Sequence, residues 1–332
     1  MTNIGIAITG SGSALPTVSL DNQGLSRIVD TSDEWISSRT GIRDRHLAQP
    51  TESLSAIATL ASQRAIAMAN LSPADIDLII LATSTADDLF GSAGQIQGQL
   101  GAAQAVAFDL TAACSGFIFG LVTASQFIKT GLYQNVLLIG GDILSRWVDW
   151  CDRRTCVLFG DGAGAVVLQA SDKDNLLGFE LHSDGSQNSS LNLSFQPEPK
   201  ELIEGIKIAK GTYQPITMNG KEIYRFAVKK VPEAIEKALF RANMTVEQID
   251  WLLLHQANQR IMDAVAERLK IPPEKVISNV AKYGNTSAAS IPIALDEFVR
   301  EGKVKPGDVI AASGFGAGLT WGAAIFQWGI DN

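Results

Sequence analysis

The chain has 332 residues, of which 46% are hydrophobic and 19% charged; this is enough for two domains or two fused halves and excludes a disordered, collagen-like or coiled-coil protein. The net charge of −8, from 35 acidic and 27 basic residues, argues against non-specific binding to nucleic acids. Three cysteines form no disulfide framework, so we expect a reducing, cytoplasmic location.

Strands and helices alternate along the chain. Hydrophobic patterns predict buried strands at Ile4–Thr9, Leu78–Ala82, Ala105–Asp109, Asn135–Gly140, Ala163–Gln169, Trp251–Leu254, Lys275–Asn279, Asp308–Ala312 and Leu319–Trp328. They predict helices at Leu54–Asn70, Ser115–Lys129, Lys221–Arg241, Gln259–Leu269 and Ala288–Arg300. This alternation is typical of an α/β fold in which helices cover parallel sheets.

Two uncharged stretches, Leu110–Ile128 and Val309–Ile330, are long enough to span a membrane. Polar residues interrupt the first, and five glycines interrupt the second, so we interpret both as buried core rather than as membrane anchors. Met1–Asn3 contains no basic segment, and we therefore expect no signal peptide.

The first and second parts of the chain resemble each other. Ile76–Leu81 (IDLIIL) matches Ile249–Leu254 (IDWLLL), and the glycines that close two predicted helices match at a similar spacing. We therefore expect two copies of one α/β half, residues 1–172 and 173–332. The alternative is chance similarity between generic strands.

At a spacing of 171 residues, Cys114 aligns with Asn285, and small residues flank both. Two such loops in related halves would meet at the centre of the molecule. A helix N-terminus favours the thiolate form of a cysteine, and the Cys114 backbone N–H could help to hold an oxyanion. The alternative is a buried structural cysteine.

His255 strengthens the catalytic interpretation of Cys114. It follows the predicted strand Trp251–Leu254 and begins a polar loop, which is where α/β folds bind ligands. We expect a nucleophile with two polar partners, Cys114 from the first half and His255 and Asn285 from the second.

Other site types fit the sequence poorly. Gly10-Ser-Gly12 lacks the third glycine of a dinucleotide-binding loop, and Cys151 and Cys156 have no histidine to complete a metal site. The segment Phe159–Gly164 is interpreted as a tight turn into a strand. We therefore expect no metal and no cofactor.

Six motifs resemble those of the β-ketoacyl-acyl carrier protein synthase III family over essentially the whole chain. They are Asp33–Arg43 (DEWISSRTGIR), Thr111–Phe117 (TAACSGF), Phe159–Gly164 (FGDGAG), His255–Arg260 (HQANQR), Lys282–Ser290 (KYGNTSAAS) and Ser313–Gly322 (SGFGAGLTWG). The resemblance implies a thiolase-like five-layer αβαβα fold, a homodimer, and initiation of type II fatty acid synthesis. Acetyl-CoA, as a substrate rather than a cofactor, and malonyl-acyl carrier protein would yield acetoacetyl-acyl carrier protein, CO2 and CoA.

The resemblance also implies residue roles. Cys114 would carry the acyl group as a thioester, while His255 and Asn285 would hydrogen-bond the malonyl thioester oxygen. The backbone N–H groups of Cys114 and Gly316 would form the other oxyanion hole. Asn285, being neutral, would act by hydrogen bonding alone.

Substrate contacts follow from the same resemblance. The residues implied for CoA and the acyl group are Trp35, Arg39, Phe90, Arg153, Gly220 and Asn258. Trp35 and Arg153 would sandwich the adenine, Gly220 and Asn258 would line the pantetheine tunnel, and Phe90 would reach the acyl pocket of a partner subunit. For Trp35 the alternative is plain packing, and for each arginine it is a solvated ion pair.

An acidic carrier protein needs a basic docking patch on this acidic chain. The residues expected to contact it are Lys221, Arg225, Gln256, Ala257, Asn258, Gln259, Arg260 and Arg268. Asp263 and Glu267 lie near this patch and would weaken docking. The alternative is an ordinary solvated helix face.

Other functions remain open at this stage. A relative could prime polyketide or quinolone synthesis or make a hydroxymethylglutaryl-type thioester. The chain could also be a non-catalytic subunit that binds acyl carrier protein, although the intact Cys114 speaks against this.

Overall fold

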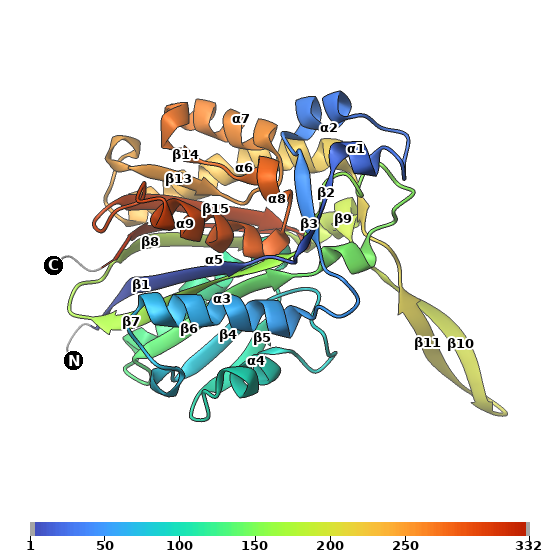
Figure 1. Ribbon diagram of the computed structural model, residues 1–332, viewed down its shortest axis with the longest axis horizontal. Helices are drawn as coiled ribbons and strands as arrows, with labels where there is room; N and C mark the ends of the chain where they lie inside the picture. The colour runs from blue at the N-terminus through green and yellow to red at the C-terminus, as the bar shows by residue number, and fades with distance from the viewer. Residues whose placement is uncertain (1–3, 330–332) are drawn as a thin grey trace.

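Two five-stranded sheets form the frame of the protein in a computed structural model that describes residues 4–329 (Figure 1). The N-terminal sheet has the order β1 (Gly5–Ala14), β7 (Gly162–Ser171), β6 (Asn135–Asp142), β4 (Leu78–Ala82) and β5 (Val106–Leu110). The C-terminal sheet has the order β8 (Leu176–Ser183), β16 (Thr320–Gln327), β15 (Val309–Gly316), β13 (Trp251–Leu254) and β14 (Val276–Ile277). The two orders are equivalent, element by element. This supports our proposal of two related halves, 1–172 and 173–332.

Helices form three layers around these sheets. α5 (Gly116–Lys129) and α9 (Ser290–Arg300) lie between the sheets and contact both. α3 (Leu54–Met68) and α4 (Ala93–Leu100) cover the outer face of the N-terminal sheet, and α6 (Gly220–Arg241) and α7 (Gln259–Leu269) cover the C-terminal sheet (Figure 1). The resulting αβαβα order confirms the predicted five-layer fold.

The remaining elements are short. They are α1 (Asn22–Leu25), α2 (Asp33–Thr40), α8 (Val280–Tyr283), the strand pairs β2 (Val18–Asp21) with β3 (Asp44–Leu47), β9 (Leu191–Asn192) with β12 (Thr217–Met218), and β10 (Phe195–Ile203) with β11 (Ile206–Tyr213). Single 3₁₀ turns occur at Pro73–Asp75, Ala113–Ser115, Leu144–Trp147, Gly185–Ser190, Val246–Gln248, Pro273–Lys275 and Ser287–Ala289.

The prediction of parallel sheets is only half right. β4 runs parallel to β5 and β6, and β13 runs parallel to β14 and β15, but β7 and β16 run antiparallel to their neighbours. No crossover helix separates β6 from β7 or β15 from β16 in the described chain, and a strand that returns directly must run antiparallel.

The two uncharged stretches are core, as the sequence predicted. Leu110–Ile128 contains the end of β5 and most of α5, whose side chains face a sheet on either side and therefore need no polar face. Residues 309–329 of the second stretch contain β15 and β16, and Ile330 lies outside the described residues, as do Met1–Asn3. None of the helices described between residues 4 and 329 is long and apolar enough to cross a membrane.

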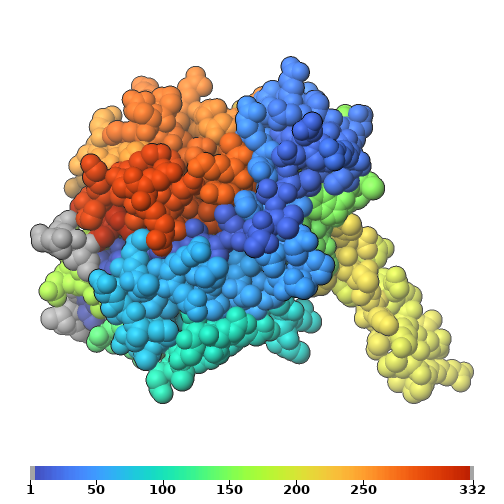
Figure 2. All heavy atoms as spheres, in the orientation of Figure 1, coloured from blue at the N-terminus to red at the C-terminus, as the bar shows by residue number. Residues whose placement is uncertain are grey.

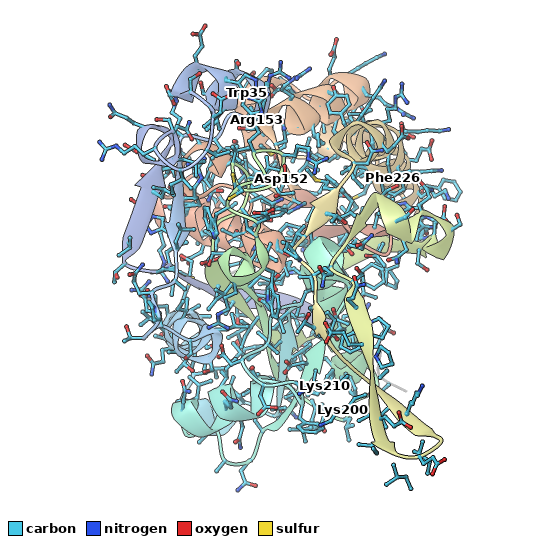
Figure 3. The ribbon with its side chains drawn as sticks, turned by 90° about the vertical axis from the view of Figure 1, so that its right-hand side faces the viewer. Trp35, Asp152, Arg153, Lys200, Lys210 and Phe226 are labelled. Atoms are coloured by element: carbon cyan, nitrogen blue, oxygen red, sulfur yellow. The ribbon has the colours of Figure 1, made fainter. Side chains whose placement is uncertain are left out.

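The hairpin of β10 and β11 was not predicted from the sequence. It projects from the body of the molecule, and Lys200 and Lys210 mark its two strands (Figures 2 and 3). Every residue of β10 is exposed. The alternating pattern that reveals half-buried strands elsewhere is weak here because neither face of the hairpin packs on the core.

Candidate active site

A cavity of about 1870 Å³ opens where strands of both sheets end. Residues that follow the carboxyl ends of β4, β5 and β13 line it, as expected for ligand sites in α/β folds. Cys114, His255 and Asn285 all face this cavity, so the structure brings the three predicted residues together.

Cys114 lies in the 3₁₀ turn that links β5 to α5 and is 8% exposed. Ala113, just before it, has a φ of 47°, which turns the chain sharply and aims the thiol into the cavity. A Cβ atom on Gly316 would lie 2.6 Å from the Cys114 backbone nitrogen. Only glycine at position 316 therefore permits β15 to approach the turn this closely.

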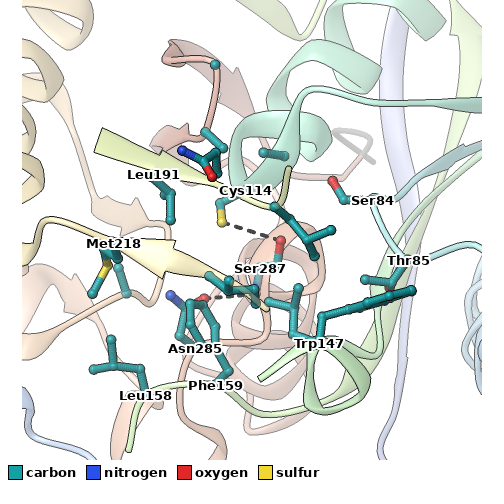
Figure 4. A pocket seen from close by; sticks show the side chains of 18 of the residues that line it. Ser84, Thr85, Cys114, Trp147, Leu158, Phe159, Leu191, Met218, Asn285 and Ser287 are labelled. Carbon is teal, nitrogen blue, oxygen red and sulfur yellow. Dashed lines mark hydrogen bonds between the residues drawn. The ribbon is translucent and has the colours of Figure 1, made fainter. Parts of the chain in front are cut away.

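The Cys114 thiol is held in its protonated form. Burial raises the pKa of Cys114 to about 12. A hydrogen bond from Ser287 Oγ to the sulfur, at 3.4 Å, acts in the opposite direction and lowers this pKa, but by less (Figure 4). The expectation of a lowered pKa at the helix N-terminus is therefore not met at this site, because desolvation by burial is the largest cause of the shift. The thiol needs a proton acceptor when it reacts.

His255 follows β13 and is buried against the edge of the Phe315 ring. Burial lowers the pKa of His255 to about 3, so the imidazole is neutral. Ser290 Oγ lies 2.7 Å from His255 Nδ1 and accepts the backbone N–H of Gln256 at 3.2 Å. Because residues 4–329 offer the buried Ser290 hydroxyl no other acceptor, we assign its proton to Nδ1 and the ring proton to Nε2.

Asn285 is fixed at both its backbone and its side chain. Its backbone N–H donates to Leu158 O, its carbonyl accepts from Gly160 N–H, and its Oδ1 accepts from Ser287 N–H at 2.9 Å (Figure 4). With Oδ1 occupied, the Nδ2 amide is the group that can donate into the cavity.

The predicted alignment of Cys114 with Asn285 is wrong. The 3₁₀ turn Ala113–Ser115 precedes α5, and the 3₁₀ turn Ser287–Ala289 precedes α9 in the same way. Each turn begins at a residue with positive φ, Ala113 in one and Ser287 in the other. The position equivalent to Cys114 is therefore Ala288. The sequence alignment missed this because the two connecting loops differ in length.

The residues expected to bind CoA line the mouth of the cavity. They are Trp35, Arg39, Phe90, Arg153, Gly220 and Asn258. Both guanidinium groups lie over the Trp35 ring, that of Arg39 at 4.9 Å and that of Arg153 at 5.2 Å from its centre. Figure 3 labels Trp35 and Arg153, which lie side by side. Phe90 is 99% exposed, and Asn258 caps α7 through its Oδ1.

The expected carrier-binding residues divide into three groups, of which the third, Gln256 and Gln259, is engaged within the chain. Lys221, Arg225, Ala257, Asn258 and Arg260 line the mouth of the cavity. Arg268 lies farther along α7, where it donates to backbone carbonyls of α6.

Gln256 cannot contact a carrier protein. It is 1% exposed, and its amide is used by Leu254 O, Ile277 O and Asn279 N–H. Gln259 is also engaged within the chain, with Ser278 and Asp263. The sequence motif suggested contact for both because it says nothing about the direction in which a side chain points.

Three site residues had no assigned role at the sequence level. Ser287 and Ser290 lie within a recognised motif, and Asp142 ends strand β6. The signal that could have revealed Asp142 is the one used for His255, a polar residue at the carboxyl end of a buried strand. Within residues 4–329 no three His, Cys, Asp or Glu side chains are grouped as a metal site would require.

Two family models match the chain. The model for the C-terminal part of 3-oxoacyl-[acyl-carrier-protein (ACP)] synthase III matches residues 239–328, and the model for 3-oxoacyl-[acyl-carrier-protein (ACP)] synthase III matches residues 108–185. The β-ketoacyl-[acyl-carrier-protein] synthase III of Nostoc sp. is 74% identical over 329 residues, covering 99% of this chain and 100% of that protein. The chain belongs to the 3-oxoacyl-[acyl-carrier-protein] synthase III family.

Solved structures agree with membership of the synthase III family. The 3-oxoacyl-[acyl-carrier-protein] synthase III of Aquifex aeolicus is 46% identical, with a TM-score of 0.89 over 98% of this chain and 100% of that one. The priming β-ketosynthase of the R1128 polyketide pathway is 34% identical, with a TM-score of 0.89 over 98% of this chain and 96% of that one. The predicted family, fold class and class of enzyme, a condensing acyltransferase of fatty acid biosynthesis, are confirmed.

Proposed function

We propose that this synthase III condenses acetyl-CoA with malonyl-acyl carrier protein, releasing CO2 and CoA and forming acetoacetyl-acyl carrier protein. The convergence of Cys114, His255 and Asn285 on one cavity carries this proposal. A buried thiol and two neutral hydrogen-bond donors suit a reaction that forms a thioester and then an enolate.

In the first half-reaction, Cys114 attacks the acetyl thioester of CoA and becomes acetylated. The oxygen of the tetrahedral intermediate would be held by the backbone N–H groups of Cys114 and Gly316. The close approach of these two residues, which leaves no room for a Cβ at position 316, supports this role. Donors fixed in place before the reaction stabilise developing charge without a reorganisation cost.

In the second half-reaction, His255 and Asn285 would donate to the malonyl thioester oxygen as decarboxylation turns the thioester into an enolate. A neutral imidazole with its proton on Nε2 and an amide with its Oδ1 already occupied both present an N–H to the cavity. The enolate then attacks the acetyl group on Cys114. These donors accelerate the step because their bonds strengthen in the transition state.

The test separates the two half-reactions. His255→Ala and Asn285→Ala should each lower the release of labelled CO2 from malonyl-carrier protein by about 10²–10³, the usual cost of one oxyanion donor. Both variants should still retain labelled acetyl on Cys114 after incubation with acetyl-CoA. If Asn285→Ala lost acetylation and kept decarboxylation, the assigned roles would be wrong.

CoA would bind along the mouth of the cavity, with its adenine between Trp35 and Arg153. For the adenine ring to fit there, Trp35 and Arg153 must lie roughly 7 Å apart, which allows one contact of about 3.5–4.0 Å on each face of the adenine. The 5.2 Å now between them requires Arg153 to move outward on binding. Its side chain is 48% exposed and is held at the surface by Asp30, so this movement costs little.

A carrier protein would dock beside this mouth, on Lys221, Arg225 and Arg260. All three are exposed and lie on α6 and α7, which pack together. We also propose a homodimer, supported by the exposed edge strand β5 and by the exposed side chains of Leu89 and Phe90 near it. A cytoplasmic location stays a proposal that rests on the low number of cysteines.

Priming of polyketide synthesis is the second candidate, because the R1128 priming ketosynthase shares this fold at 34% identity. Rates with acetyl-, isobutyryl- and octanoyl-CoA distinguish the two. A preference for acetyl-CoA supports fatty acid initiation, and a preference for a longer or branched primer supports the alternative.

A further inference from the structure

The acylation step needs a base that His255 does not provide. The Cys114 thiol must lose its proton to attack acetyl-CoA, and burial keeps the thiol protonated. The His255 ring presents its Nε2 proton to the cavity, because Nδ1 accepts from Ser290. Its very low pKa, about 3, also makes it a weak acceptor.

Asp142 is a carboxylate with no explained role at the centre of the molecule. It is fully buried at the carboxyl end of β6. Its Oδ1 accepts from Thr83 Oγ1 at 3.1 Å, Thr85 Oγ1 at 2.9 Å and Ser84 N–H at 2.8 Å. Its Oδ2 accepts from Ala288 N–H at 3.3 Å. These partners are all neutral, which is unusual for a buried carboxylate.

Ser287 connects this carboxylate to the nucleophile. Its hydroxyl lies 3.4 Å from Cys114 Sγ, and the N–H of the next residue, Ala288, donates to Asp142 Oδ2. The Ser287 hydroxyl also acts on the Asp142 carboxylate and lowers its pKa, against the larger effect of burial. One hydroxyl has a single proton and can accept another, so it can take a proton on one side while giving one on the other. The positive φ of Ser287, 52°, aims its side chain into this gap.

We propose that Ser287 and Asp142 form the proton acceptor for Cys114. The thiol proton moves to Ser287 Oγ as the sulfur attacks the acetyl carbon, and the hydroxyl proton of Ser287 moves to Asp142. When the C–S bond to CoA breaks, the proton returns by the same path and neutralises the departing CoA thiolate. The transfer is balanced: one thioester forms, one breaks, and no proton is gained or lost. This inference rests on the proposed role of Cys114 as nucleophile.

Burial raises the pKa of Asp142, which makes its carboxylate a better acceptor than an ordinary aspartate. Its negative charge also raises the pKa of Cys114, so protonating Asp142 removes a charge that opposes the thiolate.

A purely structural role for Asp142 predicts the opposite result in a simple experiment. If Asp142 acts only as a buried negative charge, Asp142→Asn makes the thiolate easier to form, and iodoacetamide alkylates Cys114 faster. If Asp142 accepts the proton, alkylation near neutral pH slows and acetyl transfer falls by about 10²-fold, within the usual range for a general base. Faster or unchanged alkylation would overturn the proposal.

Two further variants keep the test decisive if Asp142→Asn disturbs the fold. Ser287→Gly removes the hydroxyl, suits the positive φ and leaves the carboxylate in place; it should lower acetyl transfer by a similar factor and spare malonyl-carrier decarboxylation. Ser290→Ala should do the reverse, lowering decarboxylation and sparing alkylation. Wild-type acetyl transfer in Ser287→Gly would also overturn the proposal.

Asp161→Asn is the matched control, because Asp161 is equally buried, accepts from Ser145 and Ala48, and is bonded to neither Cys114 nor Ser287. It should leave the alkylation rate of Cys114 unchanged. Failure of the unsubstituted enzyme to take label on Cys114 would instead contradict the proposed function itself.

Discussion

The two turns at the centre of the molecule have the same backbone and different chemistry. Ala113–Ser115 and Ser287–Ala289 are both 3₁₀ turns that begin at a residue with positive φ and lead into a central helix. At the second position one turn has the proposed nucleophile Cys114 and the other has Ala288. Related backbones therefore place two loops at the centre, and only the side chains of one of them include a thiol.

The strand that supports each turn comes from the other half and also differs. β15 ends at Gly316 against the turn of Cys114, and β6 ends at Asp142 against the turn of Ser287. The glycine permits a close approach of backbone N–H groups, which suits an oxyanion. The aspartate fixes the opposite turn and leaves a carboxylate one hydroxyl away from the sulfur. Four predictions test the roles proposed for these turns and for the residues around them.

Replacing Cys114 should have the largest effect. Cys114→Ala should abolish both the acyl-enzyme and condensation, because no other described cysteine lines the cavity. Mass spectrometry after incubation with acetyl-CoA detects the adduct. Cys151→Ala, at an exposed position, is the control and should keep both activities; an adduct on a peptide without Cys114 would contradict the assignment.

Gly316→Ala should displace the turn Ala113–Ser115 and leave the turn Ser287–Ala289 unchanged. The added Cβ would meet the Cys114 nitrogen at 2.6 Å, so either the turn or β15 must shift and the oxyanion donors separate. We expect acetyl transfer to fall by about 10²–10³. Gly98→Ala in α4, where a Cβ meets nothing within 4 Å, is the matched control; equal rates in the two variants would show that the close approach is unimportant.

The buried neutral His255 predicts a pH dependence of stability. Its pKa is about 3 in the folded protein and 6.5 when exposed, so below pH 6.5 the unfolded chain binds a proton that the folded chain does not. Its contribution to stability is complete above pH 6.5 and falls as the pH drops towards 3. Between pH 8 and 5 this amounts to about 2 kcal/mol.

Urea unfolding at these two pH values measures the loss. His255→Gln cannot be protonated and should lose correspondingly less stability than the unsubstituted protein over the same interval. Equal losses in the two proteins would mean that the imidazole is charged or accessible in the folded state.

Charge reversal at the cavity mouth should have the smallest effect. Arg225→Glu combined with Arg260→Glu should raise the KM for malonyl-carrier protein several-fold and leave acetyl transfer from CoA unchanged, since exposed charges steer association more than they bind. Added salt should produce the same change in the unsubstituted enzyme. Arg268→Glu is the comparison, because Arg268 lies on the same helix away from the cavity. An effect of Arg268→Glu as large as that of the double variant would place docking farther along α7.

The sequence predicted most of the regular elements because their hydrophobic periods are strong. Leu78–Ala82, Trp251–Leu254 and Gln259–Leu269 have the predicted bounds, and α5 differs by one residue. Strand ends differed more: β1 continues to Ala14, and the strand predicted at Lys275–Asn279 shortens to Val276–Ile277, because Lys275 belongs to a 3₁₀ turn and Asn279 is the residue before α8. α2, α4 and β8 were missed because α2 has few apolar residues and glycines interrupt α4 and β8.

The sequence by itself determined the family, because six distinctive motifs occur in order along the chain, and those motifs contain Cys114, His255 and Asn285, the residues that we propose for catalysis. The tertiary structure decided the ionisation of those residues. Burial makes Cys114 a protonated thiol and His255 a neutral donor, reversing the expectation from the helix N-terminus. It also decided the neighbours, since Asp142, Ser287 and Cys114 meet only when strand and turns from both halves pack together. Pairing across such separations depends on the packing of whole layers, and no local pattern in the chain records it.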